Sequence, residues 1–567
     1  MRRSSDSTQG TYPAGTVQWM PGLLLGPLLR HVGEDDAVIW VETDAAGEVE
    51  VLGARERTFS ICEHHYALVN VTGLEPGRWY EYEVHLDGRA VWPESESEFP
   101  ASRFLTQRPG APAKVVFGSC RVAAPHEPPY SLRKDEDESG REIDALRTMA
   151  LQMKDEPPES WPSLILMLGD QVYADEVSPA TSAFIEARRD TSKPPGGRVL
   201  DFEEYTRLYR ESWSDPVIRW LLSTVSSAMI FDDHDVHDDW NLSAAWLAEM
   251  RATDWWHEHI VAAVMSYWVY QHLGNLGPEA HRDYELLRRV KEAGDGTEIL
   301  REFAEGADRE TGRSRWSYCR DLGDTRIVVI DARAGRVLDE ERRAMVDDSE
   351  WEWIVDKASG GHDHLLLATS LPFLLGPGMQ HLEAWSEAVA GGAWGGLASR
   401  AGEHIRQSVD LEHWGAFQRS FRAMAELQRE VASGKRGAAP ATIVTLSGDV
   451  HHAYLFEVGF PPGSQVQSTV WQAVCSPYRN PLDAKERRMI RLLLSPFAGR
   501  AAAALARSAG VTKPAVGWRN VGDGPWFDNQ VASLVIDGRR MDMRLDKAVP
   551  VDSESARLER VLDHRLA

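Results

Sequence analysis

The stretch MIFDDHDVHDDW, residues 229–240, organises the interpretation of this chain. Its three apolar residues predict the end of a buried strand, and five aspartates and two histidines follow within eight positions. Desolvated carboxylates this close together raise one another's pKa unless cations neutralise them. The stretch therefore predicts a metal site at a strand end. A solvated acidic loop is the alternative, which is disfavoured because ligand-type residues follow other strands of the chain as well.

Three more apolar runs end in residues of the same kind. The predicted strands at 114–117, 164–168 and 442–446 lead into GSC, GDQVY and SGDVHH. The carboxyl ends of strands in an α/β sheet meet at one crevice, so we expect these side chains to converge there. Gly169 and Gly448 each precede an aspartate, and glycine lets the backbone turn sharply at that point. The candidate ligands at these ends are Cys120, Asp170, Tyr173, Asp449 and His451.

Composition limits the classes of function. The 567 residues include 62 basic and 87 acidic side chains, a formal charge of −25 that opposes nonspecific binding to nucleic acid or to an anionic membrane. A phosphate substrate must therefore be attracted by local positive charge, which metal ions would supply. Four scattered cysteines predict no disulfide framework. We find no export signal and no apolar run of about 18 residues, so we expect a cytoplasmic protein.

The pattern along the chain predicts four parts. Residues 1–16 are polar and predict a disordered leader, and 17–108 alternate with period two, which predicts a small fibronectin type III-like or immunoglobulin-like β-sandwich. Residues 114–550 alternate apolar strands with helices, which predicts an α/β catalytic domain with helical insertions. Residues 551–567 predict a C-terminal helix or tail. A basic helical segment at 485–509 either packs on its own domain, which we favour, or docks on a membrane.

The successive motifs resemble a known superfamily. Gly169-Asp170, the segment 232–235 (DDHD) and the segment 448–451 (GDVH) are similar to those of calcineurin-like metallophosphoesterases. The segments 117–120 (FGSC), 169–173 (GDQVY) and 231–235 (FDDHD) narrow the resemblance to PhoD-like alkaline phosphatases. The resemblance implies an α/β fold of the metallophosphoesterase type, a β-sandwich flanked by helices, behind a small all-β module. It also implies iron(III) and calcium as cofactors, with other divalent metals as alternatives, and hydrolysis of phosphomonoesters.

Carried over by position, the resemblance assigns the metal ligands. It makes Cys120, Asp170, Tyr173, Asp449 and His451 the iron shell, and thiolate and phenolate are good ligands for a ferric ion. Oxygen ligands suit calcium, but the family has asparagines where this chain has aspartates. The choice among Asp233, Asp238 and Asp239 therefore stays open. The histidine that usually follows the fifth strand is replaced by Ser370.

The mechanism that these residues imply is in-line attack on phosphorus by a metal-bound hydroxide, with Asp170 bridging the metals. His234 is expected to stabilise or protonate the leaving oxygen. Arg333, Arg479 and Arg121 are candidates to hold a substrate oxygen, although surface salt bridges are the default for each. His452 is expected beside the ligands or the substrate.

Two other functions stay open. One is a phosphodiesterase that acts on a lipid headgroup, a nucleotide or a cell-wall polymer. The other is a binding or scaffold protein whose metals are structural. The expected partner is a small-molecule phosphate ester, nucleic acid is expected only as a cleaved substrate, and the sequence leaves the oligomeric state undetermined.

Overall fold

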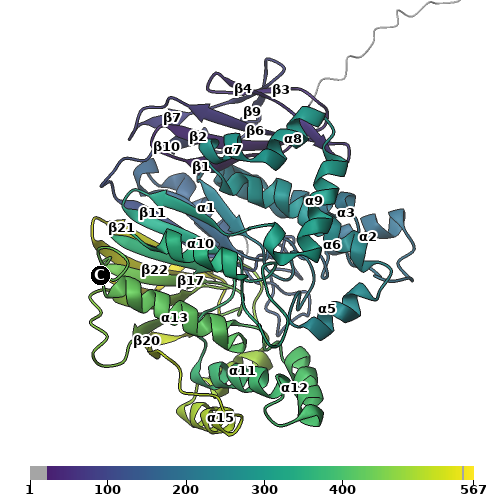
Figure 1. Cartoon of the computed structure of the whole chain (residues 1–567). Helices are drawn as coiled ribbons and strands as arrows, with labels where there is room; N and C mark the ends of the chain where they lie inside the picture. Colours follow the sequence, from purple (N-terminus) through teal and green to yellow (C-terminus); the bar gives the residue numbers. More distant parts are fainter. Residues whose placement is uncertain (1–21, 552–554) are drawn as a thin grey trace, which may run out of the picture.

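The first ten strands form an all-β region at one end of the molecule (Figure 1). The computed structural model describes residues 22–551 and 555–567, so the leader predicted at 1–16 lies outside the described residues. Sheets of order β1-β2-β6-β5 and β4-β3-β8-β9 are accompanied by the pair β10-β7. Their bounds are β1 Leu23–Val32, β2 Asp36–Thr43, β3 Glu48–Val51, β4 Ala54–Arg57, β5 Phe59–Ile61, β6 His64–Thr72, β7 Trp79–Glu81, β8 Val84–Leu86, β9 Arg89–Trp92 and β10 Arg103–Leu105. The predicted all-β character is confirmed, whereas fibronectin-likeness stays a prediction.

Buried polar contacts join this region to the rest of the chain. Arg30, on β1, is fully buried and donates to the carbonyl oxygens of Tyr270 at 2.7 Å and Gln271 at 2.8 Å. His64, on β6, contacts Glu42 at 3.2 Å and Glu203 of the larger region at 2.6 Å. Burial lowers the pKa of His64, but its hydrogen bonds to the two glutamates outweigh burial and raise the pKa above its ordinary value.

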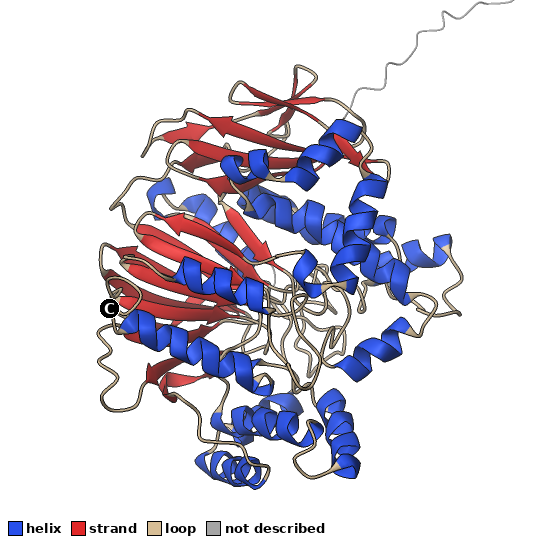
Figure 2. Cartoon of the chain, viewed as in Figure 1, coloured by secondary structure: helices blue, strands red, loops and turns tan. Residues whose placement is uncertain are grey.

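The strands of the larger region (Figure 2) form two mixed sheets. Residues from both sheets belong to one hydrophobic core. The first has the order β13-β12-β11-β21-β22-β23, and the second has the order β14-β15-β16-β17-β19-β18-β20. The bounds in the first are β11 Ala113–Gly118, β12 Leu164–Leu168, β13 Ser227–Ile230, β21 Gln530–Asp537, β22 Arg540–Pro550 and β23 Ala556–Arg565. The bounds in the second are β14 Tyr318–Leu322, β15 Thr325–Ile330, β16 His364–Thr369, β17 Thr442–Ser447, β18 Ala453–Gly459, β19 Thr469–Val474 and β20 Gly517–Trp526. The expected α/β fold is therefore present.

Helices cover the sheets and extend beyond them. α10 and α13 lie over the second sheet, while α11, α12 and α15 gather at the end of the molecule opposite the all-β region (Figure 1). Their bounds are α1 Ala145–Asp155, α2 Pro179–Arg188, α3 Phe202–Trp213, α4 Pro216–Thr224, α5 Ala244–Arg251, α6 Trp256–Tyr267, α7 Pro278–Asp283, α8 Glu285–Ala293, α9 Thr297–Arg309, α10 Asp348–Ala358, α11 Pro377–Ala390, α12 Gly396–Ser408, α13 Gln418–Ala432, α14 Ala484–Leu493 and α15 Pro496–Ser508. In the described part of the chain, no single helix is long and apolar enough to cross a membrane.

The end of the chain corrects one prediction. The predicted C-terminal helix or tail is wrong for residues 556–565, which form β23 and pair antiparallel with β22. Leu558 and Val561 pack against the core and Leu562 is buried, while charged residues fill many of the remaining positions. Those charges hide the alternation in the sequence. β23 pairs with the backbone N–H and C=O groups along the edge of β22, which would otherwise lack hydrogen-bond partners in the sheet.

Parallel pairing brings the predicted ligands together. In the first sheet Gly118 pairs with Met167, and Leu168 pairs with Ile230, so the strands β11, β12 and β13 end at the same edge of the sheet. The loop after β17 in the second sheet meets them there, because the backbone N–H of Asp449 donates to the Ser119 hydroxyl at 2.9 Å. The candidate site therefore lies between two sheets, at the carboxyl ends of their central strands.

Candidate metal centre

One buried carboxylate ties two of the strand ends together. Asp235 accepts hydrogen bonds from the backbone N–H groups of Asp170 at 3.0 Å, Gln171 at 3.1 Å, Val172 at 3.2 Å and Asp232 at 2.9 Å. Burial raises the pKa of Asp235 to about 7, against the lowering effect of these bonds. Asp235 thus fixes the backbone from which Asp170 projects, rather than facing the cavity itself.

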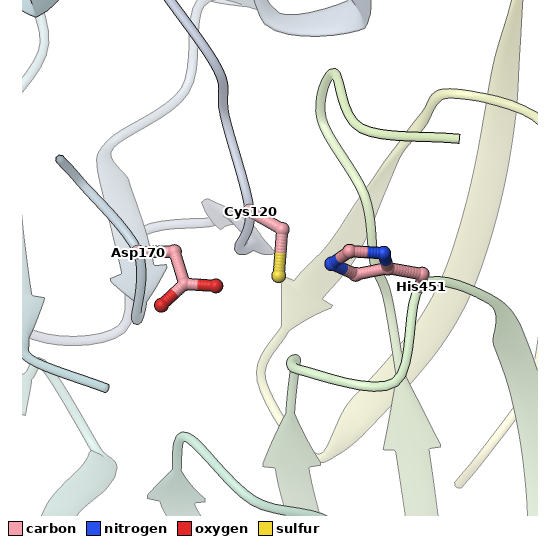
Figure 3. A group of neighbouring side chains, drawn as sticks. All are labelled: Cys120, Asp170 and His451. Carbon is pink, nitrogen blue, oxygen red and sulfur yellow. The ribbon is translucent and has the colours of Figure 1, made fainter. Parts of the chain in front are cut away.

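Cys120, Asp170 and His451 form the first group of potential ligands. Figure 3 shows their side chains pointing toward one another from three different loops, and one ligand atom from each lies within 4.8 Å of the others. The hydroxyls of Ser119 and Ser476 lie 3.0 and 3.1 Å from the Cys120 sulfur. Burial lowers the pKa of His451 to about 3, so its imidazole is neutral and has a lone pair available for a cation.

Asp170 also belongs to a second group, with Asp233 and His234. Burial raises the pKa of Asp170 well above its ordinary value, and the nearby carboxylates Asp232 and Asp233 raise it further. Its Oδ1 atom is buried and has no hydrogen-bond partner within the described residues, and the same holds for Oδ1 of Asp239. Orphaned carboxylate oxygens beside a thiol and a neutral imidazole fit cations, which would satisfy the oxygens and offset the repulsion.

An arginine occupies the third acidic group, which consists of Asp232, Asp233 and Asp449. The Arg333 guanidinium is fully buried, donates to Asp232 at 2.5 Å and lies 3.1 Å from Asp233 and 3.6 Å from Asp449. It also pairs with Glu412. These carboxylates raise the pKa of Arg333 despite burial, so it is a permanent internal cation at the base of the site.

His234 lies at the front of the site, next to a carboxylate. Its Nδ1 atom is 2.9 Å from Asp175, and its ring centroid is 4.8 Å from that of Tyr173. The backbone N–H of Asp238 donates to the other Asp175 oxygen at 2.7 Å, which fixes the carboxylate. Burial lowers the pKa of His234, but Asp175 and the carboxylates around it outweigh burial and raise it well above the ordinary value.

The two ligand groups open into a cavity of about 290 Å³. Its polar wall contains Asp170, Asp233, His234, Asp238, Asp239, Asp410, Glu412, His413, Asp449, His451 and His452. The apolar part of its wall contains Leu375, Met379, Val409, Leu482, Ile490, Leu493 and Leu494. The cavity therefore combines the candidate ligands, a histidine with a carboxylate partner, and an apolar side against which a substrate can lie.

The comparisons with known proteins agree with this arrangement. The sequence profile of PhoD-like phosphatases matches residues 145–521, well over half of the chain. The chain belongs to the PhoD-like phosphatase family. Its all-β region matches a domain of unknown function, DUF7800, over residues 20–104. No curated protein matches.

One solved structure supports the fold of this PhoD-like phosphatase. A structure described as PhoD aligns with a TM-score of 0.54 at 12% identity and covers 95% of this chain and 88% of that chain. Purple acid phosphatase PPD1 from yellow lupin (Lupinus luteus) seeds aligns with a TM-score of 0.45 at 11% identity, over 96% of this chain and 74% of that chain, a likeness too weak to argue from. Family and fold together identify a phosphoester hydrolase, and the clustered ligand groups agree with a metal-dependent one.

Several predicted residues of the PhoD-like phosphatase lie in or next to the cavity. Asp238 and His452 line it, and the His452 ring stacks on Phe527 with centroids 5.6 Å apart. Burial lowers the pKa of His452 to about 4, so it is neutral. The Tyr173 hydroxyl is 3.4 Å from Asp170 and accepts a hydrogen bond from Asn480 at 3.2 Å, which leaves it beside the first ligand group.

The three predicted arginines are not in the cavity wall. Arg121 donates to Asp144 at 2.8 Å and to the Ser212 carbonyl at 2.8 Å, and Arg479 is fully buried with a bond of 2.7 Å to the Pro125 carbonyl. Arg333 lies behind the carboxylates. Sequence reasoning identified these cations by their distance from a strand end, which does not say on which side of the ligands a long side chain lies.

Sequence reasoning missed a histidine and its partners. His413 contacts Glu383 at 2.7 Å through Nδ1 and Asp449 at 2.9 Å through Nε2, and it is accompanied in the cavity wall by Asp410 and Glu412. These residues lie between α12 and α13 and follow no strand, so the strand-end rule could not find them. The cluster DLEH at 410–413 was the only available signal.

Proposed function

We propose that this protein is a metal-dependent alkaline phosphatase that cleaves phosphomonoesters in the cavity between its two sheets. The observation that carries the proposal is that Asp170 belongs to two ligand groups at once, so one carboxylate can hold two cations side by side. An orphaned oxygen on that carboxylate supports the same conclusion.

We assign iron(III) to Cys120, Asp170, Tyr173, Asp449 and His451, because thiolate and phenolate suit a ferric ion. Calcium, or another divalent ion, fits the oxygen-rich side with Asp233, Asp238 and Asp239. When bound, such cations lower the pKa of a coordinated water and offset charge on phosphoryl oxygens.

The chain's own groups orient the substrate and move the proton. His234 faces the cavity, and its Nδ1 atom is held by Asp175, so Nε2 is the atom available to donate a proton to the leaving oxygen. Neutral His452 and the apolar wall position the remainder of the ester. Arg333 holds the carboxylates of Asp232 and Asp233 in place rather than contacting the substrate.

A phosphodiesterase is the second candidate. The apolar wall gives room for a second ester arm, and no lysine or arginine lines the cavity in the described part of the chain to bind the second charge of a monoester. Comparison of p-nitrophenyl phosphate with its bis-ester separates the two functions. The cytoplasmic location stays a prediction, which cell fractionation would test.

Asp170→Asn tests the proposed centre. The variant keeps the shape of the side chain but loses its charge, so we expect loss of both bound metals and a fall in kcat of about a thousandfold or more, equivalent to several kcal/mol. Asp523→Asn, at an exposed position, is the matched control and should change neither value. An active Asp170→Asn enzyme would contradict the shared-ligand arrangement. Wild-type protein with both metals that cleaves neither ester would favour a binding role instead.

A further inference from the structure

Three helices expose large apolar side chains: α12 and α14, which lie next to the cavity, and α15, which follows α14 in the chain. On α12, Leu397 is 87% exposed; on α14, Leu492 is 64% and Met489 is 57% exposed; on α15, Phe497 is 80% exposed. The exposed residues of α14 include positions 485, 488, 489 and 492, and those of α15 include 497, 500, 501 and 504. These spacings place each set on one helix face. We call the outward faces of these three helices the rim.

The rim is basic although the chain as a whole is acidic. Residues 484–508 contain six arginines and lysines and one glutamate, within a chain of formal charge −25. Arg487 pairs with Asp135, but no ion pair of Arg488 or Arg500 with a carboxylate is found within the described residues. Apolar side chains interspersed with unpaired cations fit a surface that is both apolar and anionic.

The rim is continuous with the catalytic cavity. α14 turns Ile490 and Leu493 inward, where they line the cavity, while Leu492 on the same helix faces out. Val409, directly after α12, also lines the cavity and is itself 49% exposed. An apolar path therefore runs from the outer surface into the cavity.

The shape of α14 and α15 favours helices that lie along a surface. The two helices together have the length and composition of a membrane span but are bent by 68° at residues 494–495. A bend of this size is unsuited to crossing a bilayer as one span, whereas amphipathic helices with basic and apolar residues lie in the plane of the interface.

We propose that the rim docks on an anionic phospholipid bilayer, with Leu397, Met489, Leu492 and Phe497 entering the headgroup region. A second copy of this chain is a poorer occupant, because a two-fold contact through α14 and α15 would place basic faces against each other with no carboxylate among their exposed residues. Docking would bring a lipid-borne phosphate ester to the cavity, a consequence that rests on the proposed function.

Vesicle binding by the full-length, metal-loaded protein tests the surface. Sedimentation is measured with vesicles of phosphatidylcholine alone and of phosphatidylcholine and phosphatidylglycerol in equal parts. We expect binding to the mixed vesicles, and we expect Arg488→Gln with Arg500→Gln to weaken it about 25-fold, since each cation near an anionic surface contributes roughly fivefold. Leu492→Gln with Phe497→Gln should weaken it about tenfold or more.

Matched controls lie at the other end of the molecule. Arg282→Gln with Arg289→Gln removes two exposed charges, and Leu52→Gln with Leu105→Gln removes two exposed leucines. Both pairs should bind vesicles like wild type. All variants should hydrolyse a soluble ester at the wild-type rate, because none of the substituted residues lines the cavity.

The outcomes separate docking from catalysis. Wild-type protein that binds mixed vesicles no better than neutral ones, or controls that lose as much binding as the rim variants, would overturn the proposal. If the wild type does not bind vesicles but forms a dimer that the rim substitutions dissociate, the rim is an interface with a second copy of the chain. Vesicle binding without hydrolysis of any ester would keep the docking surface and refute the proposed function instead.

Discussion

Replacing Asp235 by Asn should destabilise the fold at the candidate site, although Asp235 does not line the cavity. Oδ2 of Asp235 accepts from the backbone N–H groups of Asp170 and Asp232, and Oδ1 accepts from three more donors. The amide nitrogen of Asn must replace one oxygen and faces N–H donors in either orientation. In the less costly orientation two buried N–H groups lose their acceptor, at about 1–3 kcal/mol each, so we expect a loss of about 2–6 kcal/mol.

Urea unfolding of metal-free wild type and Asp235→Asn, followed by tryptophan fluorescence, measures this loss. The comparison is made a pH unit above the pKa of about 7 that burial gives this carboxyl, where the wild-type group is ionised. Asp523→Asn is the surface control and should stay within about 0.5 kcal/mol of wild type. A loss below about 1 kcal/mol for Asp235→Asn would refute the view that this carboxylate ties the strand ends together. We also expect metal affinity to fall about 10–100-fold, as when a group that orients a ligand is removed.

Three further predictions concern the candidate site and the contact between the all-β region and the larger region. Asp175→Asn should lower kcat about a hundredfold with metal content unchanged, because His234 loses the carboxylate that orients it, and equal loss of metal would contradict that role. Gly448→Ala should lower stability and metal content together, because the added methyl would clash with the Ser119 side chain and approach the Leu168 carbonyl oxygen to 3.0 Å; normal metal content would contradict this. His64 has a raised pKa, so its contribution to stability is fully present below its unfolded pKa of about 6.5 and is lost as pH rises through its folded pKa. His64→Gln should flatten the fall in thermal stability over that range, and an unchanged pH profile would argue against a charged His64.

Much of the scaffold could be predicted from the sequence because its strands are buried on both faces. Continuous apolar runs such as 164–168 and 442–446 indicate such strands directly, and β12 and β17 lie there. Between these strands the sequence was less informative. The stretch 244–272, for example, forms α5, α6 and a π-helical turn rather than one continuous helix. β23 was missed because its charges conceal the alternation of buried positions.

The candidate site was predictable in its residue types and less so in its contacts. A motif such as GDQVY locates a candidate ligand at a strand end, and the structure brings the side chains of Cys120, Asp170 and His451 together. The same reasoning could not distinguish a guanidinium that faces substrate from one that lies behind the carboxylates, as Arg333 does. The position of the Arg333 guanidinium depends on the carboxylates around it. These come from loops distant in sequence, including the loop that carries Glu412.

Strained backbone conformations are concentrated among the candidate ligands and their neighbours. Thirteen described residues other than glycine have positive φ, and six of them are Cys120, Asp170, Asp239, Asp410, Asp449 and His451, with φ between 46° and 67°. Each such conformation costs about 1 kcal/mol or more, so their concentration in the candidate metal centre opposes folding. Buried carboxylates with raised pKa add to that cost. Cation binding would offset both terms, so removing the metals should lower the thermal stability of the wild type and leave that of Asp170→Asn nearly unchanged. Equal losses in the two proteins would mean that the strain is balanced elsewhere in the fold.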